Sequence, residues 1–307
     1  MPRTDARDTR TWDTVVELSD VTKRFRRLRR GGLFHREYED VHALSHVNLT
    51  VHRGEFLAYA GPNGAGKSTT FKLLCGMLAP TEGTSRLFGL DPIRDRIAVM
   101  RRTGVLFGNR SELWWDHPVR SSFEWKRDVW AIPRADYEAR LDQLVSELRL
   151  SDFMDAFARE LSLGQRMRAN LALTLLHSPE LLLLDEPTLG LDVLAKRDLI
   201  QTLRRINRST RVTVIVTSHD MDDLHDMADR LVLIHQGAIR YDGPFDPLLR
   251  SELERRGRKA GLQVYIPPKR LCTDNAVMIG SAAFYRLMSG ALAPLSLNAL
   301  PALSMFG

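Results

Sequence analysis

The amino-acid sequence predicts an α/β fold with a mostly parallel central sheet, and three short apolar runs carry this prediction. Residues 55–60 lead directly into a glycine-rich loop, residues 181–184 are four leucines, and residues 212–216 read Val-Thr-Val-Ile-Val. Apolar runs of this length are typical of strands that are buried on both faces, as in parallel sheets covered by helices. Polar residues follow each run, and we expect them to meet at the carboxyl edge of the sheet.

The loop after the first run fits a phosphate-binding pattern. Residues 61–68 match Gly-x-x-x-x-Gly-Lys-Ser, and apolar residues recur at helical spacing from 68 to 78. Backbone N–H groups of such a loop and the positive end of the helix hold phosphate groups. We expect Lys67 to reach the β- and γ-phosphates of ATP and Ser68 to ligate Mg²⁺. The predicted ATP-binding residues of the loop are Gly61, Pro62, Asn63, Gly64, Ala65, Gly66, Lys67, Ser68 and Thr69.

Two carboxylates follow the leucine run. Asp185 is suited to hold Mg²⁺, and Glu186 is suited to act as the general base that polarises the attacking water. The alternative is an ordinary charged strand end. The neighbouring Pro187-Thr188 and Gly190-Leu191-Asp192, together with the upstream loop, favour the catalytic interpretation.

A histidine follows the third run. On its own, a histidine at a strand end is more often a surface residue or a hydrogen-bonded core residue. Here the strand is expected beside the other two, so a neutral His219 could bond the γ-phosphate and position Glu186 and water.

With Leu161-Ser162-Leu163-Gly164-Gln165, these segments resemble the nucleotide-binding subunits of ABC transporters. The phosphate loop matches the Walker A motif, residues 181–186 the Walker B motif, 161–165 the signature and 191–192 the D-loop. The resemblance covers residues 14–245. It implies a P-loop NTPase core, an N-terminal antiparallel β portion and an inserted helical subdomain at about 108–176.

The resemblance also implies partners. In the family, the signature contacts the ATP held by another subunit, so Ser162, Gly164, Gln165 and Asp192 are expected to bind ATP across a dimer of this chain with itself or a homologous ATPase. The family also implies an integral membrane permease on a separate chain, and a place on the cytoplasmic face of the cell membrane. Residues 104–116, 161–168 and 218–223 are similar to a bacterial ABC-2-type export group related to sodium- and drug-efflux ATP-binding proteins.

Three positions depart from the family pattern. Leu163 stands where the first signature glycine is usual, and Asn109 stands at the position of the Q-loop glutamine, which makes it a candidate metal ligand. Phe25 is expected to stack on adenine in place of the commoner tyrosine, since it keeps the aromatic face and loses only the hydroxyl. An insertion at residues 26–40 follows it.

Composition restricts the class of protein. The two cysteines, Cys75 and Cys272, do not indicate disulfide stabilisation and fit a reducing cytosol. The polar N-terminus, residues 1–13, does not resemble a signal peptide, and no charge-free stretch long enough for a membrane span precedes the tail. The net charge of +6 includes a basic run at residues 23–30, for which a solvated hairpin is favoured over lipid or specific nucleic-acid binding.

The expected helical subdomain begins with four of the chain's five tryptophans. The resemblance implies that this subdomain docks the permease, and we expect Trp114 or Trp115 at that surface and Phe123 and Trp130 inside. A closing β-hairpin is predicted at 231–245, with its turn at Gln236-Gly237. No function is assigned to the tail at residues 246–307.

Two other function classes share this type of ATPase domain. Soluble ABC-type switches carry two cassettes or a long coiled coil, and neither pattern occurs in this sequence. A regulatory cassette with weak hydrolysis is suggested by Asn109 and Leu163. The intact set of Lys67, Asp185, Glu186 and His219 favours an active ATPase.

Overall fold

The computed structural model describes residues 14–29, 37–107, 110–218 and 220–245, and the side chains of these ranges except at 27–29, 37 and 38. Two predicted site residues, Asn109 and His219, lie outside the described residues, as do Cys272, the N-terminus and the tail after Phe245.

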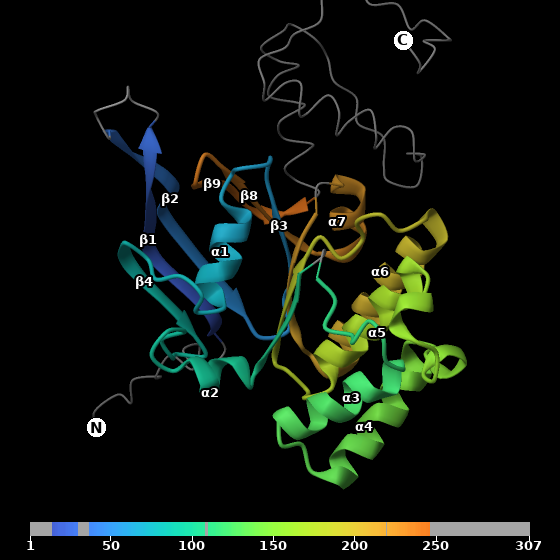
Figure 1. The fold of residues 1–307 in the computed structure, drawn as a ribbon. Coiled ribbons are helices and arrows are strands. Elements are labelled where there is room, and N and C mark those ends of the chain that lie inside the picture. Colours follow the sequence, from blue (N-terminus) through green and yellow to red (C-terminus); the bar gives the residue numbers. More distant parts are fainter. Residues whose placement is uncertain (1–13, 30–36, 108–109, 219, 246–307) are drawn as a thin grey trace, which may run out of the picture. The chain divides into compact units, whose positions relative to one another are not determined.

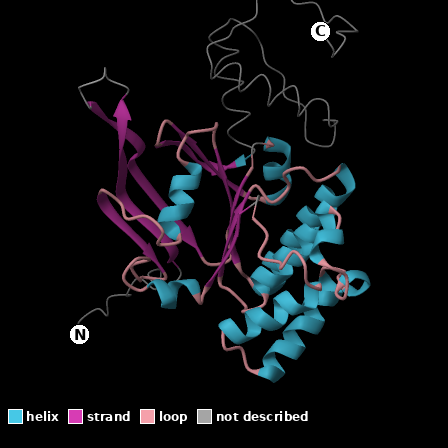
Figure 2. Ribbon diagram, viewed as in Figure 1, coloured by secondary structure: helices cyan, strands magenta, loops and turns pink. Residues whose placement is uncertain are grey.

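The central sheet has six strands in the order β5-β6-β7-β3-β8-β9 (Figures 1 and 2). Their bounds are β3 Phe56–Ala60, β5 Thr103–Phe107, β6 Leu181–Asp185, β7 Thr213–Thr217, β8 Arg230–His235 and β9 Ala238–Pro244. All neighbouring pairs are parallel except β8 and β9. The predicted α/β class with a mostly parallel sheet is therefore confirmed.

The three apolar runs form neighbouring strands of this sheet. The residues of β3 and β7 are all buried, as are the four leucines of β6. Because β6 and β7 are paired in parallel, Asp185 lies directly beside Thr217 where both strands end. The polar residues that follow these strands therefore meet at the carboxyl edge, as expected.

A second, antiparallel sheet holds β2, β1 and β4 in that order, with bounds β1 Thr14–Arg29, β2 Glu37–His52 and β4 Glu82–Leu87. Helix α1 (Lys67–Leu74) lies between the two sheets (Figure 1). Side chains of β1, β2, α1 and the central strands form one buried apolar cluster, which includes Val16, Val47, Phe71 and Leu183. This cluster fixes the helix that follows the phosphate loop.

Helix α1 is shorter than the sequence predicted. It ends at Leu74, not at Leu78, because Gly76 adopts φ +63° and turns the chain. A Cβ atom at Gly76 would lie 2.0 Å from the carbonyl oxygen of Pro92, so the close approach also requires glycine. A short helix, α2 (Arg96–Met100), precedes β5.

The segment between β5 and β6 is mostly helical. It contains α3 (Val119–Val129), α4 (Arg134–Glu147), the 3₁₀ turns η2 (Ser151–Phe153) and η3 (Ala158–Glu160), and α5 (Leu163–Leu175). Phe123 is fully buried, as predicted. The prediction for Trp130 is wrong, because this side chain is partly exposed and stacks on His177 with 4.2 Å between ring centroids.

Two helices complete the fold, α6 (Val193–Thr210) after β6 and α7 (Met221–Met227) after β7. The closing hairpin β8–β9 turns at Gln236-Gly237, as predicted. Across the described part of the chain, no helix is long and apolar enough to cross a membrane.

Candidate functional site

The phosphate loop joins β3 to α1. Gly66 precedes the helix with φ +115°, a conformation that side chains rarely allow. The ammonium of Lys67 donates to the carbonyl oxygens of Gly61 and Pro62, at 2.6 and 3.2 Å. Burial lowers the pKa of Lys67, against the opposite effect of the Glu186 and Asp185 carboxylates. A cation held inside the loop beside two acids is suited to bind phosphate.

A buried pair of hydroxyl groups supports this loop from behind. The Tyr59 hydroxyl lies 3.1 Å from that of Thr70, which in turn bonds the carbonyl oxygen of Gly66 at 3.1 Å. Burial raises the pKa of Tyr59 well above its ordinary value, so the phenol stays neutral. Sequence reasoning missed both residues, because they lie within an apolar strand and a helix with no local sign of function.

Thr217 holds the two acidic residues at the end of β6. Its hydroxyl donates to Asp185 Oδ1 at 2.6 Å and accepts the backbone N–H of Glu186 at 3.1 Å. The same N–H also lies 3.1 Å from the Thr217 carbonyl oxygen. Glu186 itself has φ +53°, uncommon for a residue with a side chain. Sequence reasoning assigned no role to Thr217, although its place beside Asp185 follows from the pairing of the strands.

A cavity of about 280 Å³ lies along this carboxyl edge. It brings together the predicted residues Ser68, Asp185 and Glu186, and it adds Arg110, which was not predicted. The residues that line it are Ser68, Lys72, Met77, Phe107, Arg110, Asp185 and Glu186.

The oxygen donors of this cavity fit Mg²⁺. The ion prefers oxygen ligands and usually takes only one or two carboxylates, with waters and substrate phosphates completing its shell. Ser68 and Asp185 supply a hydroxyl and a carboxylate on one cavity. The described residues contain no group of three or more His, Cys, Asp or Glu that could cage a metal by themselves. The donor set therefore suits a metal that arrives with a nucleotide.

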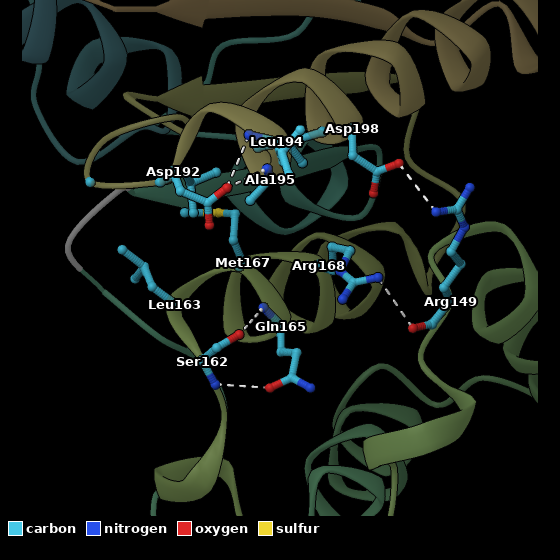
Figure 3. Close-up of a pocket in the computed structure, with 14 residues that line it drawn as sticks. Arg149, Ser162, Leu163, Gln165, Met167, Arg168, Asp192, Leu194, Ala195 and Asp198 are labelled. Atoms are coloured by element: carbon cyan, nitrogen blue, oxygen red, sulfur yellow. Dashed lines mark hydrogen bonds and ion pairs between the residues drawn. The ribbon is translucent and has the colours of Figure 1, made fainter.

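A second cavity, of about 460 Å³, lies between the starts of α5 and α6 (Figure 3). Ser162 caps α5 by accepting the N–H of Gln165, whose side chain accepts the N–H of Ser162 in return. Asp192 caps α6 by accepting the N–H groups of Leu194 and Ala195. These caps fix both helix starts around the cavity.

Leu163 lies beside Gly190, the residue before the D-loop of its own chain. A Cβ atom at Gly190 would lie 3.1 Å from Leu163 Cδ2, and the Leu163 side chain is 43% exposed. The residue that replaces the usual signature glycine is therefore placed at the rim of the second cavity.

The two cavities share none of the residues that line them. Ser162, Gly164, Gln165 and Asp192 line the second cavity, whereas Ser68, Asp185 and Glu186 line the first. Within one chain, Ser68, Asp185 and Glu186 therefore line a different cavity from the signature residues.

Phe25 lies on β1 opposite Val41 and lines neither cavity. Its ring is 38% exposed, and the ammonium of Lys23 lies 5.3 Å from the ring centroid. The ring is accessible for stacking, but its contact with adenine stays a prediction.

An aromatic surface lies on the helical segment. Trp114, Trp115 and Trp125 are 38%, 52% and 41% exposed, with 5.7 Å between the ring centroids of Trp114 and Trp125. The guanidinium of Arg166, on the signature helix, lies 4.8 Å from the centroid of Trp115. The aromatic surface is therefore in direct contact with the helix that carries the signature.

Comparison with known proteins assigns the family. Residues 44–189 match the family model described as ABC transporter. The chain is 33% identical over 220 residues to the energy-coupling factor transporter ATP-binding protein EcfA1 of Geobacillus kaustophilus, covering 70% of this chain and 78% of the relative. It is 29% identical over 241 residues to the ABC transporter ATP-binding protein NatA of Bacillus subtilis, covering 78% of this chain and 93% of the relative.

A further relative is the probable multidrug ABC transporter ATP-binding protein YbhF of Escherichia coli, 32% identical over 242 residues, covering 77% of this chain and 38% of the relative. Among solved structures, the dimeric post-hydrolysis state of the ATP-binding cassette MJ0796 bound to ADP and Pi is 25% identical with a TM-score of 0.63, covering 75% of this chain and 98% of that chain. The chain therefore belongs to the family of ABC transporter ATP-binding proteins, and it is an ATPase.

Proposed function

We propose that two copies of this chain bind ATP with Mg²⁺ between them, hydrolyse it, and drive a separate membrane permease that exports its cargo. The observation that carries the dimer is the separation of the two cavities in one chain. Ser68, Asp185 and Glu186 of the Walker motifs line one cavity and the signature residues line the other, which supports a nucleotide bound between two chains. The related cassette MJ0796 was solved as a dimer bound to ADP and Pi.

Nucleotide binding is assigned to the phosphate loop, which holds Lys67, and to the neighbouring carboxyl edge of the sheet. Its ammonium is already turned into the loop, where it would exchange the Gly61 and Pro62 carbonyl oxygens for phosphate oxygens. Ser68 and Asp185 would hold Mg²⁺, with Asn109 as a further candidate ligand. When bound there, Mg²⁺ would supply positive charge that offsets the negative charge developing during phosphoryl transfer.

Hydrolysis is assigned to Glu186 and His219. Glu186 would polarise the attacking water, and His219 would hold the γ-phosphate and the water in line. Thr217 fixes the Glu186 backbone relative to Asp185, which keeps the base and the metal ligand in register. Such fixed positioning supplies much of the rate gain in phosphoryl transfer.

The second copy would complete the site from the other side. Ser162, the backbone of Gly164 and Gln165 lie at the start of α5, where helix N–H groups attract phosphate. Asp192 lies on the same rim. Closure of the dimer would bring these groups to the γ-phosphate, and product release would reopen it.

The permease and the direction of transport follow from family likeness. The exposed tryptophans of the aromatic surface suit a partner protein, because Trp is enriched at interface hot spots. Export is inferred from the likeness of residues 104–116, 161–168 and 218–223 to the ABC-2-type export group. On this account the ATPase domain spans 14–245, and it acts at the cytoplasmic face of the cell membrane.

The test is capture of the partner with a chain that binds ATP without hydrolysing it. Tagged Glu186→Gln protein is incubated with Mg-ATP and detergent-solubilised membranes of its host, and the bound proteins are identified by mass spectrometry. A polytopic membrane protein in stoichiometric amount, absent when Lys67→Ala is the bait, is the expected result. Recovery of only ribosomes, DNA or soluble proteins would refute the transport role.

A further inference from the structure

A cluster of polar and charged residues lines a cavity beside Glu186 and has no assigned role. We call it the Lys196 cluster, and it consists of Thr188, Lys196, Asp220 and Asp223. Its members come from three segments, since Thr188 follows β6, Lys196 lies on α6, and the two aspartates lie at the start of α7. The cluster therefore joins the chain after Glu186, the helix after the D-loop and the helix after His219.

One cation holds the cluster together. Lys196 Nζ lies 2.8 Å from Asp220 Oδ2 and 3.1 Å from Asp223 Oδ2. Thr188 lines the same cavity as both aspartates. The other oxygen of Asp220, Oδ1, accepts the N–H groups of Asp222 and Asp223 and so caps α7. Asp220 thus bonds Lys196 with one oxygen and fixes the start of α7 with the other.

Burial makes these contacts strong. Asp223 is 5% exposed and Thr188 is 3% exposed. Burial raises the pKa of Asp223 above its ordinary range, against the opposite effect of Thr188 and Lys196. Burial acts to lower the pKa of Lys196, but its bonds to Asp220 and Asp223 outweigh this and raise it. Without Lys196, the buried Asp223 carboxylate would lose its cation and keep the half-exposed Asp220 carboxylate as a neighbour.

The cluster is adjacent to the catalytic base. Thr188, Lys196, Asp220 and Asp223 line a cavity of about 220 Å³, and Glu186 lines the same cavity. Glu186 and Thr188 are two residues apart, and the carbonyl oxygen of Glu186 accepts the N–H of Leu189 in a tight turn. A displacement of Thr188 would therefore be passed directly to the backbone of Glu186.

The other end of the cluster reaches the surface assigned to the second copy. Lys196 lies one helical turn after Asp192, whose carbonyl oxygen accepts the Lys196 N–H at 2.9 Å. Between them, Val193 and Leu194 are 74% and 78% exposed. Docking of a second copy against the start of α6 would therefore move Lys196 together with Asp192.

We propose that Lys196 is a positioning residue, which couples docking of a second copy at the start of α6 to the placement of Glu186 and of the start of α7. The proposal rests on the dimer described under the proposed function. It predicts that loss of Lys196 slows the hydrolytic step while ATP binding, which uses the distant Lys67 loop, is retained.

The test compares the steady-state ATPase of full-length Lys196→Met, Lys196→Arg and a matched control, Arg197→Met. Arg197 is the exposed neighbour on the same helix, so its loss removes the same charge from α6. For Lys196→Met we expect kcat to fall about tenfold, with the KM for ATP changed less than about twofold. Lys196→Arg, which can still reach both carboxylates, should recover most of the lost kcat.

A double variant separates positioning from mere neutralisation of buried charge. Lys196→Met with Asp223→Asn removes the cation and its buried partner together, so it should fold even where Lys196→Met alone is unstable. If Lys196 positions Glu186, the kcat of this double variant stays low. A kcat restored to the wild-type value, or a Lys196→Met kcat within twofold of Arg197→Met, would overturn the proposal.

The dimer itself is checked in the same assay with wild-type protein. A composite site requires that hydrolysis per chain rises with protein concentration in the range where dimers form. A rate per chain that is independent of concentration, from a protein that stays monomeric with ATP, would reject the dimer. That outcome is distinct from a failure of the proposal for Lys196, which is judged by comparing the kcat of Lys196→Met with the kcat of Arg197→Met.

Discussion

Replacing Thr217 by valine tests how the catalytic edge is assembled. The change keeps the shape of a fully buried side chain and removes only its hydroxyl. That hydroxyl donates to Asp185 Oδ1 at 2.6 Å and accepts the Glu186 N–H at 3.1 Å. The Glu186 N–H keeps its second acceptor, the Thr217 carbonyl oxygen, so the principal loss falls on the Asp185 carboxylate.

The magnitude follows from the charge of the acceptor. A hydrogen bond to a charged group contributes about 1.5–3 kcal/mol, and about 1.4 kcal/mol corresponds to a factor of ten in rate. We therefore expect Thr217→Val to lower kcat/KM for Mg-ATP by about ten- to a hundredfold. The Mg²⁺ concentration required for half-maximal rate should rise as well, because Asp185 is the proposed metal ligand.

The assay is steady-state ATP hydrolysis titrated with Mg²⁺, with the melting temperature measured in parallel. Thr217→Ser is the matched control, since it retains the hydroxyl and loses only a methyl group. A Thr217→Val protein with wild-type kcat/KM for Mg-ATP and unchanged Mg²⁺ dependence would refute the assignment. So would equal losses in the serine and valine variants.

Two further predictions concern the helical segment. Lys126 is 5% exposed and forms an ion pair with the more exposed Glu112 at 2.5 Å. Because Glu112→Ala leaves a buried cation unpaired, it should lower the free energy of unfolding by about 3 kcal/mol, whereas Lys126→Met should lower it by about 1 kcal/mol. Urea unfolding measures both losses, and equal losses would contradict this asymmetry. His177 has its pKa lowered to about 4, first by burial and then by Lys126. The unfolded chain takes up this proton below about pH 6.5 while the native chain does not, so stability falls as pH drops, by about 2 kcal/mol between pH 7 and 5. His177→Gln should lose less stability over that range, as measured by urea unfolding at both pH values, and an equal loss would refute the assignment.

The central strands could be predicted from the sequence because each is a single short run of mostly apolar residues. The leucines of β6 are all apolar, the residues of β7 are all β-branched, and these residues are buried in the sheet. The structure adds that the signature and the D-loop each lie at the start of a helix, where Ser162 caps α5 and Asp192 caps α6.

What the sequence did not reveal depends on contacts between distant segments. The predicted helix after the phosphate loop was too long because apolar spacing continues past Gly76, whereas the approach of Pro92 ends the helix there. Thr217 and Tyr59 were missed because a hydroxyl within an apolar strand has no local sign of its partner. The Lys196 cluster joins three segments, and its pairing appears only when α6 and α7 are packed together.

The central claim is that ATP joins two copies of this chain, and the most direct test is the mass of the Glu186→Gln protein in solution. Light scattering after size exclusion is recorded with Mg-ATP, with Mg-ADP and without nucleotide. The account predicts the mass of one chain, 34.9 kDa, without nucleotide and with Mg-ADP, and twice that mass with Mg-ATP. The double variant Glu186→Gln with Lys67→Ala should keep the mass of one chain under all three conditions. A protein that binds ATP yet keeps the mass of one chain would contradict the composite site.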